Sequence, residues 1–335
     1  MNDYVTALLH ELDVAAPQLA PQSIFFGGGT PSILPVALWK IILDALAKNF
    51  PTPPREWTVE CNPATVDADK ARLWIDTGVN RISLGVQSFD DTLLQRLGRI
   101  HTVAEIESTV GIMRAAGLDN LNLDIMFGLP GQTMEQWRDT LRRTLALRPE
   151  HLSAYCLTLE EDTEFWRQFQ RGALRPDLDH ELAMYRLLIE TLAAAGYRHY
   201  EISNFAKPGR ECCHNIAYWE GKDYLGLGPS AFSTVGRRRW ENIADTIRYT
   251  AAILEGHSPV NFEEQLTKKT KFGERIAFGL RMLDGIPGHL VHPRWDSEIN
   301  ALLADNLVHW CNDRLQLTPR GLLFADEVAA EFVSY

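Results

Sequence analysis

Residues 23–34 read SIFFGGGTPSIL, a short apolar run that ends in three glycines followed by Thr-Pro-Ser. The β-branched and aromatic residues before the glycines predict a strand, and the periodic pattern over residues 35–50 predicts a helix after it. Glycines at the end of a strand allow the backbone to approach a ligand closely. We therefore expect a small polar ligand to bind at this turn.

The same strand–helix unit repeats through the first half of the chain. We expect strands at residues 23–26, 58–61, 81–86, 121–127 and 151–157, and helices at residues 35–50, 67–77, 103–116 and 134–147. This alternation predicts a parallel sheet with helices outside it. Polar groups follow four successive strands, and such ends carry the chemistry of barrel folds, so they predict one converging site. Taken singly, each is better explained as a solvated strand end.

Eight motifs carry a resemblance that covers almost the whole chain. In order, they are GGGTPS, VECNP, RISLGVQSF, LGRIHT, NLDIMFGLPGQT, YEISNFAKPG, CHNIAYW and YLGLGPSAFS. In these motifs the chain resembles the HemW-type haem chaperones, radical S-adenosylmethionine (SAM) proteins related to oxygen-independent coproporphyrinogen III oxidases. The resemblance implies an α/β fold: a partial (β/α) TIM-like barrel of the radical SAM type that lacks its first strand, and a small C-terminal winged-helix-like domain.

The resemblance divides the chain into three parts. We expect the partial barrel in residues 1–205, a connecting region with the HNxxYW motif and several glycines in residues 206–260, and the winged-helix-like domain in residues 261–335. From about residue 262 the pattern is helical, with a possible strand at residues 314–317 and a last helix at residues 321–332. Residues 261–335 carry 8 Lys+Arg against 11 Asp+Glu, which argues against DNA binding by this domain.

The resemblance also implies a SAM pocket at the strand ends. An arginine can clamp a carboxylate through two hydrogen bonds, and carboxylates suit an ammonium group or ribose hydroxyls. For the arginine, the alternative is an exposed charge beside a helix. By position in the motifs, the SAM-contacting residues are Gly28, Gly29, Thr30, Glu60, Gln87, Arg99 and Asp124.

The cysteines depart from the family pattern. Related proteins hold a [4Fe–4S] cluster with three thiolates of a CxxxCxxC motif, placed just ahead of the helix that begins here near Tyr4. The five cysteines have no such spacing, so the cluster is expected for the family but its ligands are absent from this sequence. The edge beside residues 23–26 is then expected to be unpaired. A start assigned too late, or a trimmed sequence, is favoured over a loss of radical chemistry, because the charged SAM residues are retained.

The HNxxYW motif marks the haem-chaperone branch of the family and contains His214, Asn215, Tyr218 and Trp219. Imidazole is a ligand of haem iron, and aromatic rings can cover the apolar macrocycle. By resemblance, we predict His214, Tyr218 and Trp219 as haem contacts, with His214 as the iron ligand. Outside this family context, a core histidine beside packed aromatic residues would be the better interpretation. Cys212 and Cys213 are alternative ligands, although buried cysteines more often act as small apolar fillers.

Three classes of function remain open. The first is a haem chaperone that binds haem and passes it to an acceptor protein, with SAM and cluster sites that serve the transfer. The alternatives are a coproporphyrinogen III dehydrogenase that uses a 5′-deoxyadenosyl radical, and a pseudo-enzyme that retains only SAM binding, so enzymatic activity is an open question. The net charge of −11 argues against a nucleic-acid partner. The odd number of cysteines and the lack of a secretory signal or apolar span predict a cytoplasmic protein without an integral membrane segment. A homodimer is a further possibility.

Overall fold

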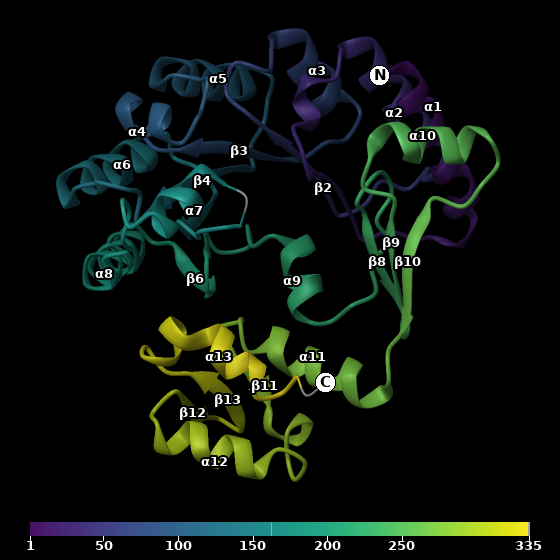
Figure 1. Cartoon of the computed structure of the whole chain (residues 1–335). Helices are drawn as coiled ribbons and strands as arrows, with labels where there is room; N and C mark the ends of the chain where they lie inside the picture. Colours follow the sequence, from purple (N-terminus) through teal and green to yellow (C-terminus); the bar gives the residue numbers. More distant parts are fainter. Residues whose placement is uncertain (162, 334–335) are drawn as a thin grey trace.

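The computed structural model of the protein describes residues 1–161 and 163–333 (Figure 1). Its main sheet has seven strands in the order β1-β2-β3-β4-β5-β7-β6. Strands β1 to β5 run parallel, and the β6–β7 hairpin pairs antiparallel to β5 at the far edge. The sheet curls into a half-barrel, which confirms the predicted fold class. The strands are β1 (Ser23–Phe26), β2 (Glu56–Cys61), β3 (Arg81–Gln87), β4 (Leu121–Phe127), β5 (His151–Cys156), β6 (Arg198–Glu201) and β7 (Asn204–Ala206).

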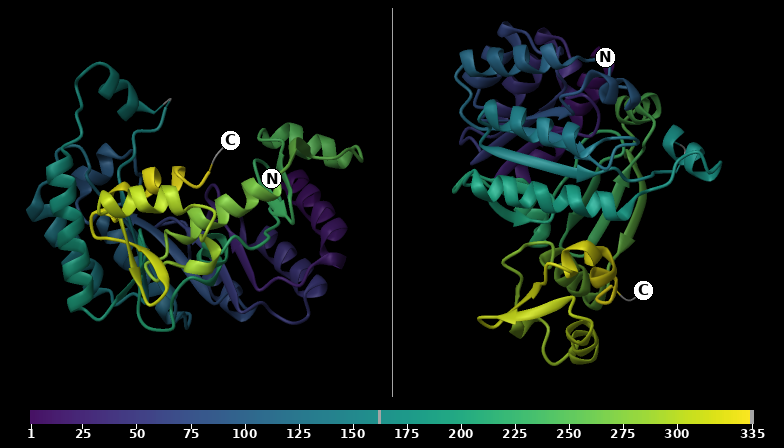
Figure 2. Two further views of the ribbon diagram at one scale, coloured as in Figure 1. Left: turned by 90° about the horizontal axis from the view of Figure 1, so that it is seen from below. Right: turned by 90° about the vertical axis from the view of Figure 1, so that its left-hand side faces the viewer.

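Helices cover the outer, convex face of this sheet (Figure 2). Phe26 of β1 meets Trp39 edge-on with ring centroids 4.9 Å apart, and Trp39 packs in turn on Trp74 at 5.1 Å. Both tryptophans are fully buried, so the hydrophobic core that fixes the strands lies in this outer layer. The helices here are α2 (Val36–Asn49), α3 (Ala68–Asp76), α5 (Val103–Ala115), α6 (Met134–Ala146) and α8 (Leu178–Ala194), joined by two short helices that we did not predict, α4 (Asp91–Arg96) and α7 (Glu164–Gln170).

The inner, concave face of the same strands is polar. Side chains alternate between the two faces of a strand, and the inward residues of β2 to β5 are largely charged, hydroxyl-bearing, amide or imidazole groups. Parallel strands that are packed on both faces are usually apolar throughout, so this alternation separates a packed outer face from an inner face available for a site. The inward polar residues are Glu56, Thr58, Glu60, Arg81, Ser83, Asn122, Asp124, His151 and Ser153.

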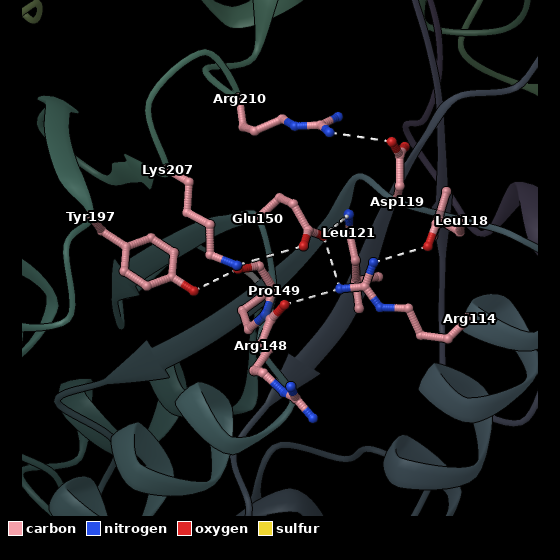
Figure 3. Close-up of polar contacts among 10 residues, drawn as sticks. All are labelled: Arg114, Leu118, Asp119, Leu121, Arg148, Pro149, Glu150, Tyr197, Lys207 and Arg210. Carbon is pink, nitrogen blue, oxygen red and sulfur yellow. Dashed lines mark hydrogen bonds and ion pairs between the residues drawn. The ribbon is translucent and has the colours of Figure 1, made fainter.

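A strap formed by residues 207–212 carries the chain from β7 past the starts of β5 and β4, and Figure 3 draws its polar contacts. Lys207 Nζ lies 3.6 Å from the carboxylate of Glu150, which precedes β5, and Arg210 lies 3.2 Å from Asp119, which precedes β4. Glu150 also pairs with Arg114 at 2.8 Å and accepts a hydrogen bond from the backbone N–H of Leu121. These contacts direct the strap from the far edge of the sheet towards β2 and β1, where α9 (Cys213–Trp219) begins.

The region after α9 packs against the N-terminal helix α1 (Asn2–Ala15) and consists of a second small sheet and one helix. The sheet has antiparallel strands in the order β10-β9-β8, formed by β8 (Phe232–Val235), β9 (Arg238–Asn242) and β10 (Val260–Gln265), and the helix is α10 (Thr246–Leu254). The expectation of helix from about residue 262 was wrong, because Phe262 lies in β10, which pairs with β9. Glu11 of α1 holds this region: its carboxylate accepts hydrogen bonds from Tyr249 Oη at 2.6 Å, Gly228 N at 2.8 Å and Asn242 Nδ2 at 2.7 Å.

The C-terminal part has a third sheet and its own apolar cluster. Buried residues such as Ile276, Trp295 and Leu315 pack together here. Backbone hydrogen bonds from Ile202 N to Arg281 O and from Leu283 N to Tyr200 O tie it to the β6–β7 hairpin. The elements are α11 (Lys268–Gly279), β11 (Ile286–Pro287), α12 (Asp296–Ala304), β12 (Val308–Cys311), β13 (Arg314–Leu317) and α13 (Ala325–Ala330), with strand order β11-β13-β12. None of the helices in the described ranges is long and apolar enough to cross a membrane.

We expect the Glu11→Ala variant to lose about 2–4 kcal/mol of unfolding free energy, because three donors would lose one shared acceptor in a partly buried position. Urea denaturation of the whole chain measures this loss. Asp13→Ala on the same helix is the matched control: Asp13 is exposed and accepts a single hydrogen bond, from Asn49 Nδ2 at 3.1 Å. Equal unfolding free energies for the two variants would show that Glu11 does not hold the connecting region.

Candidate functional site

An inner cavity of about 320 Å³ lies on the polar face of the half-barrel. Three of the residues predicted from successive strand ends, Glu60, Gln87 and Asp124, line it together, so the structure confirms that these side chains converge. Asn215, from the HNxxYW motif, lines it as well. The complete lining is Phe25, Glu60, Arg81, Ser83, Gln87, Asn122, Asp124, Ser153, Tyr155 and Asn215.

The two carboxyl groups of the inner cavity are electrostatically unfavourable when both are charged. Burial, and then the charge of Asp124, raises the pKa of Glu60 to about 7. Burial also raises the pKa of Asp124, against hydrogen bonds from Asn122, Ser83 and Ser153 that favour its charged form. Near neutral pH the pair therefore holds part of a proton, and a cationic or hydroxyl-rich ligand would relieve the repulsion.

Gln87 lines this cavity, and the glycine turn, whose residues line the outer groove described below, adjoins it through Glu60. The backbone N–H of Gly28 donates to Glu60 Oε2 at 3.3 Å, and Thr30 Oγ1 accepts from Asn62 Nδ2 at 3.1 Å. A Cβ at Gly28 or Gly29 would meet nothing within 4 Å, so open space adjoins this backbone. Gln87 has a φ of +66° at a bulge between β3 and β4, which directs its side chain into the cavity.

Arg99 is the predicted SAM residue that the structure does not bring to the others. It is partly exposed, follows α4, and lines neither the inner cavity nor the larger groove described next. Its backbone N–H bonds to Leu94 O at 2.9 Å. In this arrangement Arg99 therefore fits the alternative interpretation, a charge beside a helix.

An outer groove of about 1990 Å³ runs along β1, between α1, α9 and the glycine-rich stretch at residues 223–229. His214 lines it and stacks on Phe25 of β1, with ring centroids 4.5 Å apart. The His214 Nδ1 atom lies 3.3 Å from Ser23 Oγ, whereas Nε2 has no hydrogen-bond partner within the described part of the chain. Burial lowers the pKa of His214 to about 4, so the ring is neutral at physiological pH and Nε2 can act as a metal ligand.

The first turn of α9 is held by one carboxylate on the inner face. Glu56 Oε2 accepts from Cys213 N at 2.8 Å, and Glu56 Oε1 accepts from His214 N at 3.0 Å and from Cys212 Sγ at 3.3 Å. An acidic group at a helix start satisfies N–H groups that have no partner inside the helix. Glu56 therefore fixes where His214 and Asn215 enter the site.

A directional chain of hydrogen bonds connects α9 with the inner cavity. Burial lowers the pKa of His151 well below its usual value, so the ring is neutral. Its Nδ1 donates to Asn122 Oδ1 at 2.6 Å, and its Nε2 accepts from Tyr200 Oη at 2.8 Å. Tyr200 Oη in turn accepts from Cys212 N at 3.3 Å, and Asn122 Nδ2 donates to Asp124 Oδ1 at 2.7 Å. Every polar atom of the chain has a defined role as donor or acceptor.

Tyr218 and Trp219 both line the outer groove. The Tyr218 ring meets His214 edge-on at 5.0 Å and lies 4.4 Å from Tyr224, which places it beside the imidazole. Trp219 has a second role, because the guanidinium of Arg281 lies 4.8 Å from its ring centroid. That contact ties α9 to the start of the C-terminal part.

Comparison with known proteins identifies the family to which this chain belongs. Residues 4–144 match the Radical SAM superfamily. The heme chaperone HemW of Lactococcus lactis is 34% identical over 343 residues, with 99% of this chain and 90% of that protein covered. The heme chaperone HemW of Escherichia coli is 35% identical over 350 residues, with the same coverage. The chain belongs to the HemW family. Among solved structures, its fold is similar to that of the radical SAM enzyme coproporphyrinogen III oxidase (HemN) of Escherichia coli, at a TM-score of 0.84 and 24% identity, covering 100% of this chain and 83% of that one.

In this HemW family member the cysteines lie on different elements. Cys61 is buried on β2, Cys156 ends β5, Cys311 lies on β12, and Cys212 and Cys213 are adjacent at the start of α9. Within residues 1–161 and 163–333, no three or more His, Cys, Asp or Glu side chains are arranged to hold a metal ion. Burial raises the pKa of the Cys212 thiol to about 12, which disfavours the thiolate that a metal requires. The residues present therefore do not fit a [4Fe–4S] cluster.

The structure adds site residues that the motifs did not single out. Arg81, Ser83, Asn122, Ser153 and Tyr155 line the inner cavity, and none was predicted to do so. A signal was available in the sequence, because these residues occupy alternate positions of strands that otherwise read as apolar. Glu56, which holds α9, lies at the start of such a strand and carried no motif of its own.

The raised pKa of Glu60 makes the unfolding free energy of the protein depend on pH. A carboxyl group whose pKa rises from 4.5 to about 7 on folding binds more protons in the folded state between those values, so its contribution to stability is lost as pH rises through this window. We expect Glu60→Gln to be more stable than the wild type at about pH 8 and similar to it below about pH 4.5. Urea denaturation across this range measures the difference.

Glu190→Gln is the control for this experiment, since Glu190 is exposed on α8. Its unfolding free energy should follow that of the wild type at each pH. Parallel profiles for the wild type and Glu60→Gln would show that Glu60 titrates as an ordinary carboxylate.

Proposed function

We propose that the protein is a haem chaperone, in which His214 binds haem in the outer groove for transfer to an acceptor protein. The proposal rests mainly on one observation: His214 lines a groove of about 1990 Å³ beside Tyr218, and its neutral ring has no partner for Nε2 within the described part of the chain. A groove of this size exceeds that of most small-molecule sites. A neutral imidazole is a suitable ligand for haem iron. Bound haem would supply the metal centre and the flat apolar surface.

SAM would bind at the inner cavity and the adjoining glycine turn. Gly28, Gly29 and Thr30 would contact it through the backbone, and Glu60, Gln87 and Asp124 through their side chains. The raised pKa values of Glu60 and Asp124 support a ligand that brings positive charge or hydroxyl groups. Arg99 remains a candidate only if its side chain turns towards the cavity. Because the cysteines do not fit a cluster, no radical step is part of this proposal.

The remaining parts of the proposed function concern partners and location. We propose an unidentified haem-acceptor protein as the partner, with a homodimer as the possible assembly and the cytoplasm as the compartment. The similarity to proteins described as heme chaperones supports an acceptor. We further propose that residues 1–205, 206–260 and 261–335 act as barrel, connecting region and C-terminal domain.

We expect the wild type to give a Soret band on haem titration and the His214→Ala variant to bind haem at least tenfold more weakly, because the iron would lose its protein ligand. The control is His257→Ala, which removes an exposed histidine paired only with Glu255. If His214→Ala retains the affinity and the spectrum of the wild type, His214 is not the ligand. If the wild type itself binds no haem, the proposed function is wrong.

For SAM, we expect Asp124→Asn to lower the affinity about tenfold to a hundredfold, the range for losing a hydrogen bond to a charged group. Isothermal titration calorimetry with SAM measures this change. Asp119→Asn serves as the control, because Asp119 is exposed at the opposite end of the strands, in an ion pair with Arg210. Unchanged SAM binding by Asp124→Asn would remove this carboxylate from the SAM site.

A further inference from the structure

Arg81 is an unusual residue of the inner cavity. It begins β3, is only 2% exposed and lines the cavity. Its Nε atom is buried without a hydrogen-bond partner, and no hydrogen bond joins its guanidinium to any residue in the described ranges. A buried cation without such partners is costly, so a ligand that satisfies it would be stabilised.

The anionic groups near Arg81 already have other partners. Glu56 accepts from the backbone of α9 and from Cys212. Asp124 accepts from Asn122 and from Ser83 Oγ at 3.0 Å. Both carboxylates act on Arg81 through space, and with Cys212 and Tyr200 they raise its pKa against the effect of burial. They keep Arg81 charged, yet its donors stay available to the cavity.

The inner cavity adjoins the outer groove. Phe25 and Asn215 line both, so they form the wall between Arg81 and the groove that His214 faces. The Asn215 side chain makes no hydrogen bond with a residue in the described ranges, and it lines the same cavity as Arg81. A ligand in the inner cavity meets Arg81 directly, whereas a ligand in the outer groove would have to pass an acidic group between Phe25 and Asn215 to reach it.

We propose that Arg81, assisted by Asn215, is the binding site for a carboxylate group of the ligand. The planar guanidinium donates two parallel hydrogen bonds, which match the two oxygens of a carboxylate. Two sources carry this group: a propionate of haem in the outer groove, which rests on the proposed function above, and the methionyl carboxylate of SAM in the inner cavity.

The test compares the affinity for each ligand with the affinity for an analogue that lacks the free carboxylate. The affinities of haem and of haem dimethyl ester are measured from the Soret band, and those of SAM and of decarboxylated SAM by calorimetry. Both pairs are measured on the wild type and on Arg81→Gln. For the ligand that Arg81 binds, we expect the wild type to prefer the acid by about tenfold to a hundredfold. In Arg81→Gln that preference disappears, while affinity for the ligand without the acid changes little.

Lys222→Gln is the matched control, because Lys222 is an exposed cation that lines the outer groove. It should keep the preference of the wild type, which separates a specific contact from general attraction. If haem is the discriminating ligand, the carboxylate is a propionate; if SAM is, it is the methionyl group.

The proposal is overturned if the wild type discriminates in neither pair, or if Arg81→Gln keeps the discrimination. If the variant does not fold, a wild type that discriminates in neither pair still overturns the proposal. A wild type that binds neither haem nor its ester contradicts the proposed function, and the SAM pair then tests Arg81 by itself.

Discussion

The carboxylate of Glu56 is the contact on which the arrangement of the site depends. It lies at the start of β2 on the inner face and accepts hydrogen bonds from both Cys213 N and His214 N. Without this acceptor, nothing else in the first turn of α9 would satisfy these donors, because the helix has no side-chain cap of its own. By fixing α9 against the sheet, Glu56 places His214 in the outer groove and Asn215 at the inner cavity.

The polar inner face of the half-barrel is stable because its groups satisfy one another. Burying an imidazole or an amide without partners would cost several kcal/mol in total, at about 1–3 kcal/mol for each unsatisfied group. His151, Asn122 and Tyr200 avoid this cost through their shared chain of hydrogen bonds. Arg81 does not, because its Nε is buried without a partner, and on this face it shares that state with the uncharged hydroxyl of Thr58.

The sequence predicted the strands of the half-barrel closely, because their apolar residues and glycine-rich ends are local signals. It also predicted that Glu60, Gln87 and Asp124 converge, since parallel strands end at one edge. It could not place α9 at β1, because that contact depends on Glu56, which is more than a hundred residues earlier in the chain. It misjudged Phe262, since a short exposed strand such as β10 carries little periodicity and is fixed by pairing with β9.

The path of the strap makes the position of α9 depend on the assembled sheet. Lys207 contacts Glu150 before β5, Arg210 contacts Asp119 before β4, and α9 then rests on β2 and β1. Each contact joins segments far apart in the chain, and such contacts form late, after the intervening chain has been ordered. A chain whose sheet is incomplete therefore cannot hold His214 in place. The outer groove therefore forms only in molecules whose sheet is assembled, so a ligand proposed to bind there would be taken up by folded molecules alone.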